Sequence, residues 1–95
     1  MRLTVSHGAV ADLDRLHEFL VGKDSSAAQR VAGTIDDAVR SLTDFPQRGR
    51  PSGIAGVREL IVPFGQSAYV VRYAYWASRD EIVILRLWHG REERK

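Results

Sequence analysis

Three apolar segments in the second half of the chain show the alternating pattern that is typical of β-strands. They are rich in β-branched and aromatic residues and cover residues 57–62, 67–75 and 81–89. Turn-forming stretches separate them, at Pro63-Phe64-Gly65-Gln66 and at residues 76–80. This pattern predicts a meander of three antiparallel strands joined by hairpin connections.

The first half of the chain predicts a short strand followed by a helix. Residues 1–5 alternate between apolar and polar positions, which suits a strand with one buried face. A helix should then run from Gly8 or Ala9 to Val21, with Ser6 as its N-cap and Gly22 at its C-terminal end. Four residues at helical spacing form its apolar stripe: Ala9, Leu13, Leu16 and Leu20. The acidic residues of this helix, including Asp12, are expected on its exposed surface.

A second amphipathic helix is predicted from Ala27 to Phe45. Ser25 or Ser26 can cap it, and Pro46 ends it because proline cannot continue a helix. Its apolar stripe consists of Ala28, Val31, Ile35, Val39 or Ala38, Leu42 and Phe45. Gly33 lies inside this helix, where it would permit close approach of the first helix.

The order of these elements, β-α-α-β-β-β, predicts a single α+β domain over residues 1–95. We expect a helical hairpin packed on one face of a twisted, mainly antiparallel four-stranded sheet. Two helices can cover only one face of such a sheet. The other face should therefore be open, or covered by a partner.

Composition excludes several classes of protein. The chain has no cysteine, no run of about 18 apolar residues and no apolar leader, so we expect a cytoplasmic protein without disulfides or a membrane span. Its three histidines have no metal-ligand spacing, and we expect neither a metal nor a cofactor. The net charge is −2 for residues 1–45 and +4 for residues 46–95. This excess either serves solubility or meets an anionic partner.

Arginines interrupt the three predicted strands, at Arg58, Arg72 and Arg86. We expect Val71 and Tyr73 of one strand, and Leu85 and Leu87 of the next, to face the helices. Arg72 and Arg86 then share the open face, provided that the register brings them together. Their like charges would then repel, and an anion or a carboxylate would relieve the repulsion. The alternative is that each guanidinium extends to solvent from a half-buried strand or pairs with Glu59 or Glu81.

Taken together, several segments of the chain resemble the RelE/ParE superfamily of toxins from type II toxin–antitoxin modules. The segments are, in order, Ala11-Asp12-Leu13, Phe45-Pro46, Gly49-Arg50-Pro51, residues 57–62, Tyr69-Val70-Val71-Arg72-Tyr73 and residues 84–91. The resemblance covers essentially the whole chain. It rests on the order and spacing of these segments, because each one alone is weakly specific.

The resemblance implies one of two activities. RelE-like members cleave messenger RNA on the ribosome, whereas ParE-like members lack nuclease residues and inhibit DNA gyrase. Both kinds are neutralised by a cognate antitoxin, ParD-like or RelB-like, and reach operator DNA only through it. A third alternative is a degenerate toxin that binds only its antitoxin.

Departures from the nuclease pattern favour the ParE-like alternative. A nuclease would use Arg58 and Arg86 for charge stabilisation and His89 as acid or base. However, Val70 occupies the position where RelE-like nucleases carry an arginine, and the basic cluster of their second strand is reduced to Arg58. The chain also ends at Lys95, without the C-terminal tyrosine of many of these nucleases.

The closing stretch of the chain looks more like ParE, whose C-terminal end is implicated in toxicity. By this resemblance we assign target binding to Arg86, His89 and Arg91. On physical grounds we expect Arg50, Arg58 and Arg72 to bind an anion or the acidic residues of the antitoxin. The alternative for the loop residue Arg50 is a solvated connection.

Overall fold

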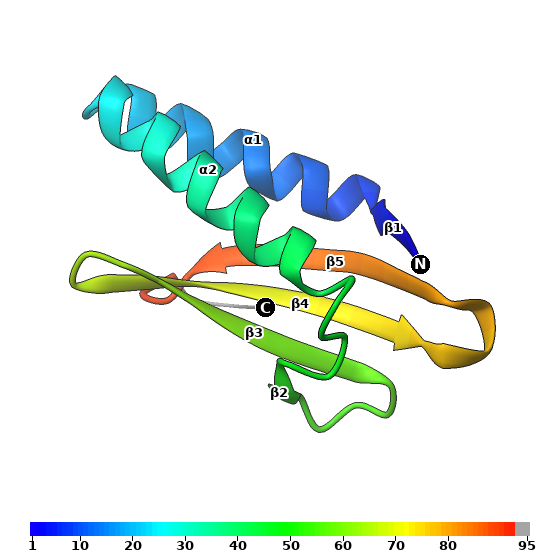
Figure 1. Ribbon diagram of the computed structural model, residues 1–95. Helices are drawn as coiled ribbons and strands as arrows, with labels where there is room; N and C mark the ends of the chain where they lie inside the picture. Colours follow the sequence, from blue (N-terminus) through cyan, green and yellow to red (C-terminus); the bar gives the residue numbers. More distant parts are fainter. Residues whose placement is uncertain (93–95) are drawn as a thin grey trace.

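The computed structural model of the protein describes residues 1–92. Two helices, α1 (His7–Val21) and α2 (Ser25–Ser41), lie side by side over one face of a sheet (Figure 1). The strands are β1 (Arg2–Val5), β2 (Arg50–Pro51), β3 (Val57–Phe64), β4 (Ser67–Trp76) and β5 (Glu81–His89), with a short 3-10 helix, η1 (Ala77–Arg79), before β5. The predicted α+β class and helical hairpin are confirmed.

The sheet has five strands within residues 1–92, in the order β1-β5-β4-β3-β2. β1 runs parallel to β5, and the other pairs are antiparallel. The prediction of four strands was wrong because it missed β2. In this strand Arg50 pairs with Glu59 and Pro51 pairs with Arg58. Two residues are too few to produce an alternating pattern, so this strand leaves no signal in the sequence.

The predicted ends of α1 are confirmed, whereas the predicted cap of α2 is wrong. Ser6 caps α1 as expected, because its hydroxyl accepts a hydrogen bond from the Ala9 N–H. α1 ends at Val21 and is followed by Gly22, as predicted, and Gly22 itself has an ordinary right-handed φ of −65°. Asp24, rather than Ser25 or Ser26, caps α2 through its carboxylate.

The predicted end of the second helix at Phe45 was wrong by four residues. α2 ends at Ser41, and the chain continues in tight turns toward Pro46. Phe45 is 66% exposed and takes no part in the core. A helix-like spacing of apolar residues therefore continued for one turn beyond the helix itself.

The core fills the space between the helices and the sheet, with α1 along β5 and α2 over β3. Its fully buried members include Leu42, Val71, Tyr73, Ile82, Ile84 and Leu87. Of the three apolar residues among residues 1–5, only Leu3 packs against the core, because Met1 and Val5 are exposed. We expected Gly33 to permit close approach of the first helix. A Cβ on Gly33 would meet no atom within 4 Å, so this prediction was wrong.

A β-bulge between β4 and β5 changes which side chains of β5 face the core. Arg72 pairs with Arg86, but Tyr73 pairs with Ile84, so Leu85 has no partner on β4. Before the bulge, Ile82 and Ile84 enter the core; after it, Leu87 does. The prediction that Leu85 faces the helices was therefore wrong, because strict alternation fails at an inserted residue.

No element within residues 1–92 covers the opposite face of the sheet (Figure 1). That face is nevertheless shielded by its own side chains. The guanidinium carbon of Arg72 lies 5.2 Å from the centroid of a Trp88 ring, and Trp88 is only 9% exposed.

None of the described helices has the length and apolar character needed to cross a bilayer.

Candidate functional site

Asp12 of α1 is a buried carboxylate that joins the first helix to the last strand. It is 4% exposed, although we expected it on the helix surface. Its Oδ2 accepts from Arg86 Nε at 2.8 Å and from the Leu87 N–H at 2.8 Å, and its Oδ1 accepts from Arg86 Nη2 at 3.1 Å. Arg15 Nη2 lies 3.3 Å from the same Oδ1. Asp12 thus accepts four hydrogen bonds from three residues, as a buried charge requires.

These contacts set the protonation of the pair. Burial by itself raises the pKa of Asp12, but hydrogen bonds from Arg86, the Leu87 N–H and Arg15 outweigh it and lower the pKa below its ordinary value. The hydrogen bond to Asp12 in turn raises the pKa of Arg86. Asp12 is therefore a carboxylate, and Arg86 a cation, throughout the neutral range.

Arg72 is neutralised by a different carboxylate, within the sheet. Its Nη2 and Nε lie 2.7 and 3.1 Å from Glu59 Oε2, and Arg50 Nη2 lies 3.7 Å from Glu59 Oε1. The alternative in which Arg72 pairs with Glu59 is correct. Arg86 uses Asp12 instead of Glu81. The two arginines are register partners, as expected. Their guanidinium groups nevertheless point apart, because Arg72 binds Glu59 on β3 and Arg86 binds Asp12 on α1, so they do not form one anion site.

Arg58 holds the loop before the sheet. Its Nη1 donates to the Gly49 carbonyl at 2.7 Å and, more weakly, to the Gln47 carbonyl at 3.4 Å. The Tyr73 hydroxyl supports the same loop, because it accepts from the Gly49 N–H at 2.9 Å and donates to the Pro46 carbonyl at 2.8 Å. Burial raises the pKa of Tyr73. This loop is therefore pinned to β3 and β4.

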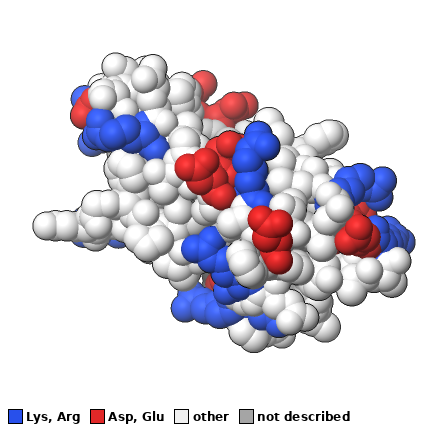
Figure 2. Space-filling model, in the orientation of Figure 1, with Lys and Arg blue, Asp and Glu red and all other residues white. Residues whose placement is uncertain are grey.

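Lys and Arg do not gather into one large patch on the face drawn in Figure 2. Basic and acidic side chains alternate across it. Among residues 46–92, the basic side chains are divided between ion pairs, such as those of Arg72 and Arg86, and separate exposed groups such as Arg91. An extended electrostatic surface of the kind that binds a nucleic-acid backbone is not visible on this face.

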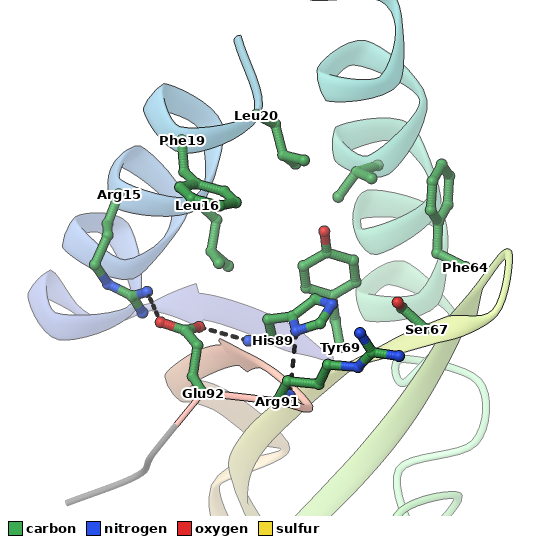
Figure 3. A pocket seen from close by; sticks show the side chains of 11 residues that line it. Arg15, Leu16, Phe19, Leu20, Phe64, Ser67, Tyr69, His89, Arg91 and Glu92 are labelled. Carbon is green, nitrogen blue, oxygen red and sulfur yellow. Dashed lines mark hydrogen bonds and ion pairs between the residues drawn. The ribbon is translucent and has the colours of Figure 1, made fainter. Parts of the chain in front are cut away.

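The C-terminal turn places His89 and Arg91 at the mouth of a pocket (Figure 3). The His89 N–H donates to Glu92 Oε1 at 2.6 Å, and the Arg91 N–H donates to His89 Nδ1 at 3.1 Å. The imidazole meets the Tyr69 ring edge to face, with centroids 5.1 Å apart. Burial and the nearby Glu92 raise the pKa of Tyr69.

The pocket has a volume of about 590 Å³ and lies between the C-terminal half of α1 and the β3–β4 hairpin. Its lining is mainly apolar, with charged groups at the rim (Figure 3). The residues are Arg15, Leu16, Phe19, Leu20, Val31, Phe64, Ser67, Tyr69, His89, Arg91 and Glu92. Sequence reasoning found His89 and Arg91 but missed Arg15 and Glu92, whose pairing spans 77 residues and has no local signal.

The three residues that a nuclease would use do not converge. Arg58 lies opposite Tyr73, whereas His89 lies opposite Tyr69, four residues away on β4. At about 3.3 Å per residue this separates their backbones by roughly 13 Å along the strand. Arg86 is bound to Asp12 at the edge of β5. Within residues 1–92 there is also no group of three or more His, Asp or Glu side chains that could hold a metal.

Comparison with known proteins identifies the family. A family model described as the ParE toxin of the type II toxin–antitoxin system, parDE, matches residues 3–94. Toxin RelE1 of Caulobacter vibrioides is 44% identical over 90 residues, which are 95% of this chain and 94% of that protein. Toxin RelE3 of the same organism is 34% identical over 83 residues, 87% of each chain.

A solved structure shares the fold as well. The structure described as the chromosomal ParDE TA system from P. aeruginosa matches with a TM-score of 0.77 and 27% identity. The match covers 94% of this chain and 95% of that one. Family and fold therefore agree over nearly the full length. The chain belongs to the ParE toxin family of type II toxin–antitoxin systems, within the RelE/ParE superfamily.

Proposed function

We propose that this toxin inhibits DNA gyrase by binding it through the C-terminal turn, without hydrolytic chemistry of its own. The observation that supports this most is the dispersal of Arg58, Arg86 and His89, which leaves no assembled acid–base site. Cleavage of RNA requires a base for the 2′-hydroxyl, an acid for the leaving oxygen and a cation at the phosphate, all within hydrogen-bond reach of one another. The match to the ParE toxin family over residues 3–94 supports the same conclusion.

Among the residues assigned to target binding, Arg91 and His89 are best placed. Arg91 is exposed, and its guanidinium has no ion-pair partner among residues 1–92. His89 stands beside it at the pocket mouth. Arg86 keeps 57% of its side chain exposed but is held by Asp12, so it contributes a fixed positive charge rather than a mobile contact.

The proposed second partner is a cognate antitoxin, which neutralises the toxin in the cytoplasm and alone contacts operator DNA. Of the three arginines assigned to anion or antitoxin binding, Arg50 is the most available, because its side chain is 64% exposed and its contact with Glu59 is long. Arg72 is only 20% exposed. Arg58 is occupied by the loop carbonyls. We therefore expect Arg50 to meet an acidic antitoxin residue first.

A supercoiling assay tests the proposal. Purified toxin added to gyrase and relaxed plasmid should block supercoiling or accumulate cleaved DNA. The same toxin premixed with its antitoxin is the control and should have no effect. Gyrase that works normally with excess free toxin would refute the proposal.

The second candidate function is ribosome-dependent cleavage of messenger RNA. It is favoured by the names of the Caulobacter relatives, which are called RelE toxins. Primer extension on translated messages should then show codon-dependent cuts that disappear on substitution of His89. A degenerate toxin that binds only its antitoxin would give no effect in either assay.

A further inference from the structure

Arg15 of α1 bridges two carboxylates that come from opposite ends of the chain. Its Nη2 lies 3.3 Å from Asp12 Oδ1, one turn earlier on the same helix, and 3.3 Å from the Leu87 carbonyl oxygen. Its Nη1 forms an ion pair with Glu92 Oε2 in the C-terminal turn (Figure 3). The planar guanidinium can serve these acceptors together because its donors point in fixed, different directions.

Glu92 also hydrogen-bonds to His89, one of the residues assigned to target binding. Its second oxygen, Oε1, accepts the His89 N–H at 2.6 Å, while its own N–H donates to the His89 carbonyl at 2.8 Å. The Arg91 N–H is bound to the His89 ring. The turn also touches β4, where the Gly90 N–H donates to the Ala68 carbonyl at 2.8 Å. One carboxylate thus connects α1 to the turn that carries His89 and Arg91.

α1 is hydrogen-bonded to β5 next to this connection. The buried Asp12 accepts a hydrogen bond from the Leu87 N–H, and Arg15 donates one to the Leu87 carbonyl, so α1 binds both backbone polar groups of one residue of β5. Arg15 itself is 44% exposed and reaches out from these contacts to Glu92, which is 34% exposed. Arg15 is therefore the residue through which α1 contacts the turn formed by residues 89–92.

We propose that Arg15 is a positioning residue: it holds the turn formed by residues 89–92 against α1 and so fixes where His89 and Arg91 meet the target. The inference rests on the proposed function for its effect on gyrase. The anchoring itself is a property of the free toxin. Without Arg15, Glu92 keeps only the hydrogen bonds within its own turn, and the turn loses its attachment to the helix layer.

The test compares Arg15→Gln with a matched control, Arg40→Gln, in the full-length toxin. Arg40 is also a helix arginine in an ion pair, with Asp36, but lies on the exposed face of α2 away from the turn. Amide hydrogen exchange of His89 and Arg91, measured by NMR, reports the anchoring. Gyrase supercoiling reports the function, and urea unfolding reports the global stability.

Arg15→Gln should speed exchange of the His89 and Arg91 amides about tenfold, as expected for loss of the charge-assisted contact between Arg15 and Glu92. The Leu87 amide, which is held by Asp12, should stay protected. Inhibition of gyrase should weaken by a similar factor, while Arg40→Gln leaves all three readouts unchanged. Glu92→Gln should reproduce the effect, and combining it with Arg15→Gln should add little, because both remove the same contact. Arg15→Lys, with a single ammonium, should give partial rescue.

Unchanged exchange at His89 and Arg91 in Arg15→Gln would overturn the anchoring. Uniformly faster exchange, including Leu87, would also overturn it, because it would show a general loss of stability. Faster exchange with undiminished inhibition would overturn the positioning role. If the wild-type toxin does not affect gyrase, the proposed function fails, and the exchange data still decide whether Arg15 anchors the turn.

Discussion

Asp12 and Arg86 are 74 residues apart in the sequence, and they form a two-point ion pair with separations of 2.8 and 3.1 Å. The pair lies where β1 stops covering β5. β1 pairs with β5 only as far as Ile84, after which the Ser6 hydroxyl donates to the Leu85 carbonyl and Asp12 accepts the Leu87 N–H. Side chains at the start of α1 thus satisfy the strand edge that β1 leaves open.

Removal of the Asp12 charge should destabilise the fold. In Asp12→Asn the charge-assisted hydrogen bonds of Arg86 and Leu87 are lost or weakened, at a cost of about 1–3 kcal/mol in the free energy of unfolding at pH 7. Asp36→Asn, which breaks the exposed pair with Arg40, should cost less than about 0.5 kcal/mol. Urea unfolding of the two variants measures both. Equal effects would show that Asp12 is no more important than a surface carboxylate.

The contribution of Asp12 should depend on pH in a defined direction. Its pKa in the folded state lies below the ordinary value of 3.8, so on acidification the unfolded chain takes up the proton first. The stabilisation is therefore complete above pH 3.8 and is lost as the pH falls through the lower, folded-state pKa. The difference in unfolding free energy between wild type and Asp12→Asn should be constant near neutrality and shrink in acid. A difference that grows in acid would contradict the sign of this pKa shift.

Two glycines should respond in opposite ways to alanine. A Cβ on Gly49 would lie 2.8 Å from Cε1 and from the hydroxyl of Tyr73 and 3.0 Å from the backbone of Glu59, so Gly49→Ala should cost about 1–3 kcal/mol. Gly33 lies inside α2 with open space around it, so Gly33→Ala should gain up to about 1 kcal/mol. Thermal unfolding of both variants tests the pair. A stabilised Gly49→Ala would mean that the loop shifts freely away from Tyr73.

The hydroxyl of Tyr73 should matter independently of its ring. Tyr73→Phe keeps the buried ring but leaves the Gly49 N–H and the Pro46 carbonyl without their partner, which should cost about 1–3 kcal/mol. Tyr75→Phe is the control, because the Tyr75 hydroxyl makes no hydrogen bond within residues 1–92. Faster amide exchange at Gly49 in Tyr73→Phe alone would locate the effect in the loop. Similar stabilities of both variants would contradict it.

The fold could be read from the sequence where local pattern determines structure. The strands from Val57 to His89 and the first helix cap at Ser6 follow from alternation and from side-chain chemistry within three residues. The alternating pattern gave a wrong prediction where the strand contains an irregular residue. The bulge at Leu85 exchanges the core-facing and outward-facing positions for half of β5, and no feature of residues 81–89 predicts this bulge.

The candidate site was less predictable because its contacts are between distant residues. Arg72 and Arg86 were expected to repel each other, and the register does place them opposite one another. Their carboxylate partners come from a neighbouring strand for one and from a helix 74 residues away for the other. Asp12 looked like a surface residue because helical periodicity describes one helix and not what packs beside it. Sequence reasoning could therefore name charged residues, but not which charges remained unpaired.

Arg91 provides the sharpest test of the C-terminal turn as the surface that meets the target. Because its guanidinium has no ion-pair partner within residues 1–92, Arg91→Ala should change the free energy of unfolding by less than about 0.5 kcal/mol. A contact with a target would nevertheless be lost, and the toxin concentration that half-inhibits gyrase should rise at least about tenfold, the effect of one charge-assisted hydrogen bond. Arg79→Ala is the matched control: Arg79 is also an exposed arginine, stacked 4.9 Å from a Trp76 ring at the far end of β5. Equal inhibition by wild type and Arg91→Ala, with Arg79→Ala weakened instead, would place the target on the opposite end of the sheet.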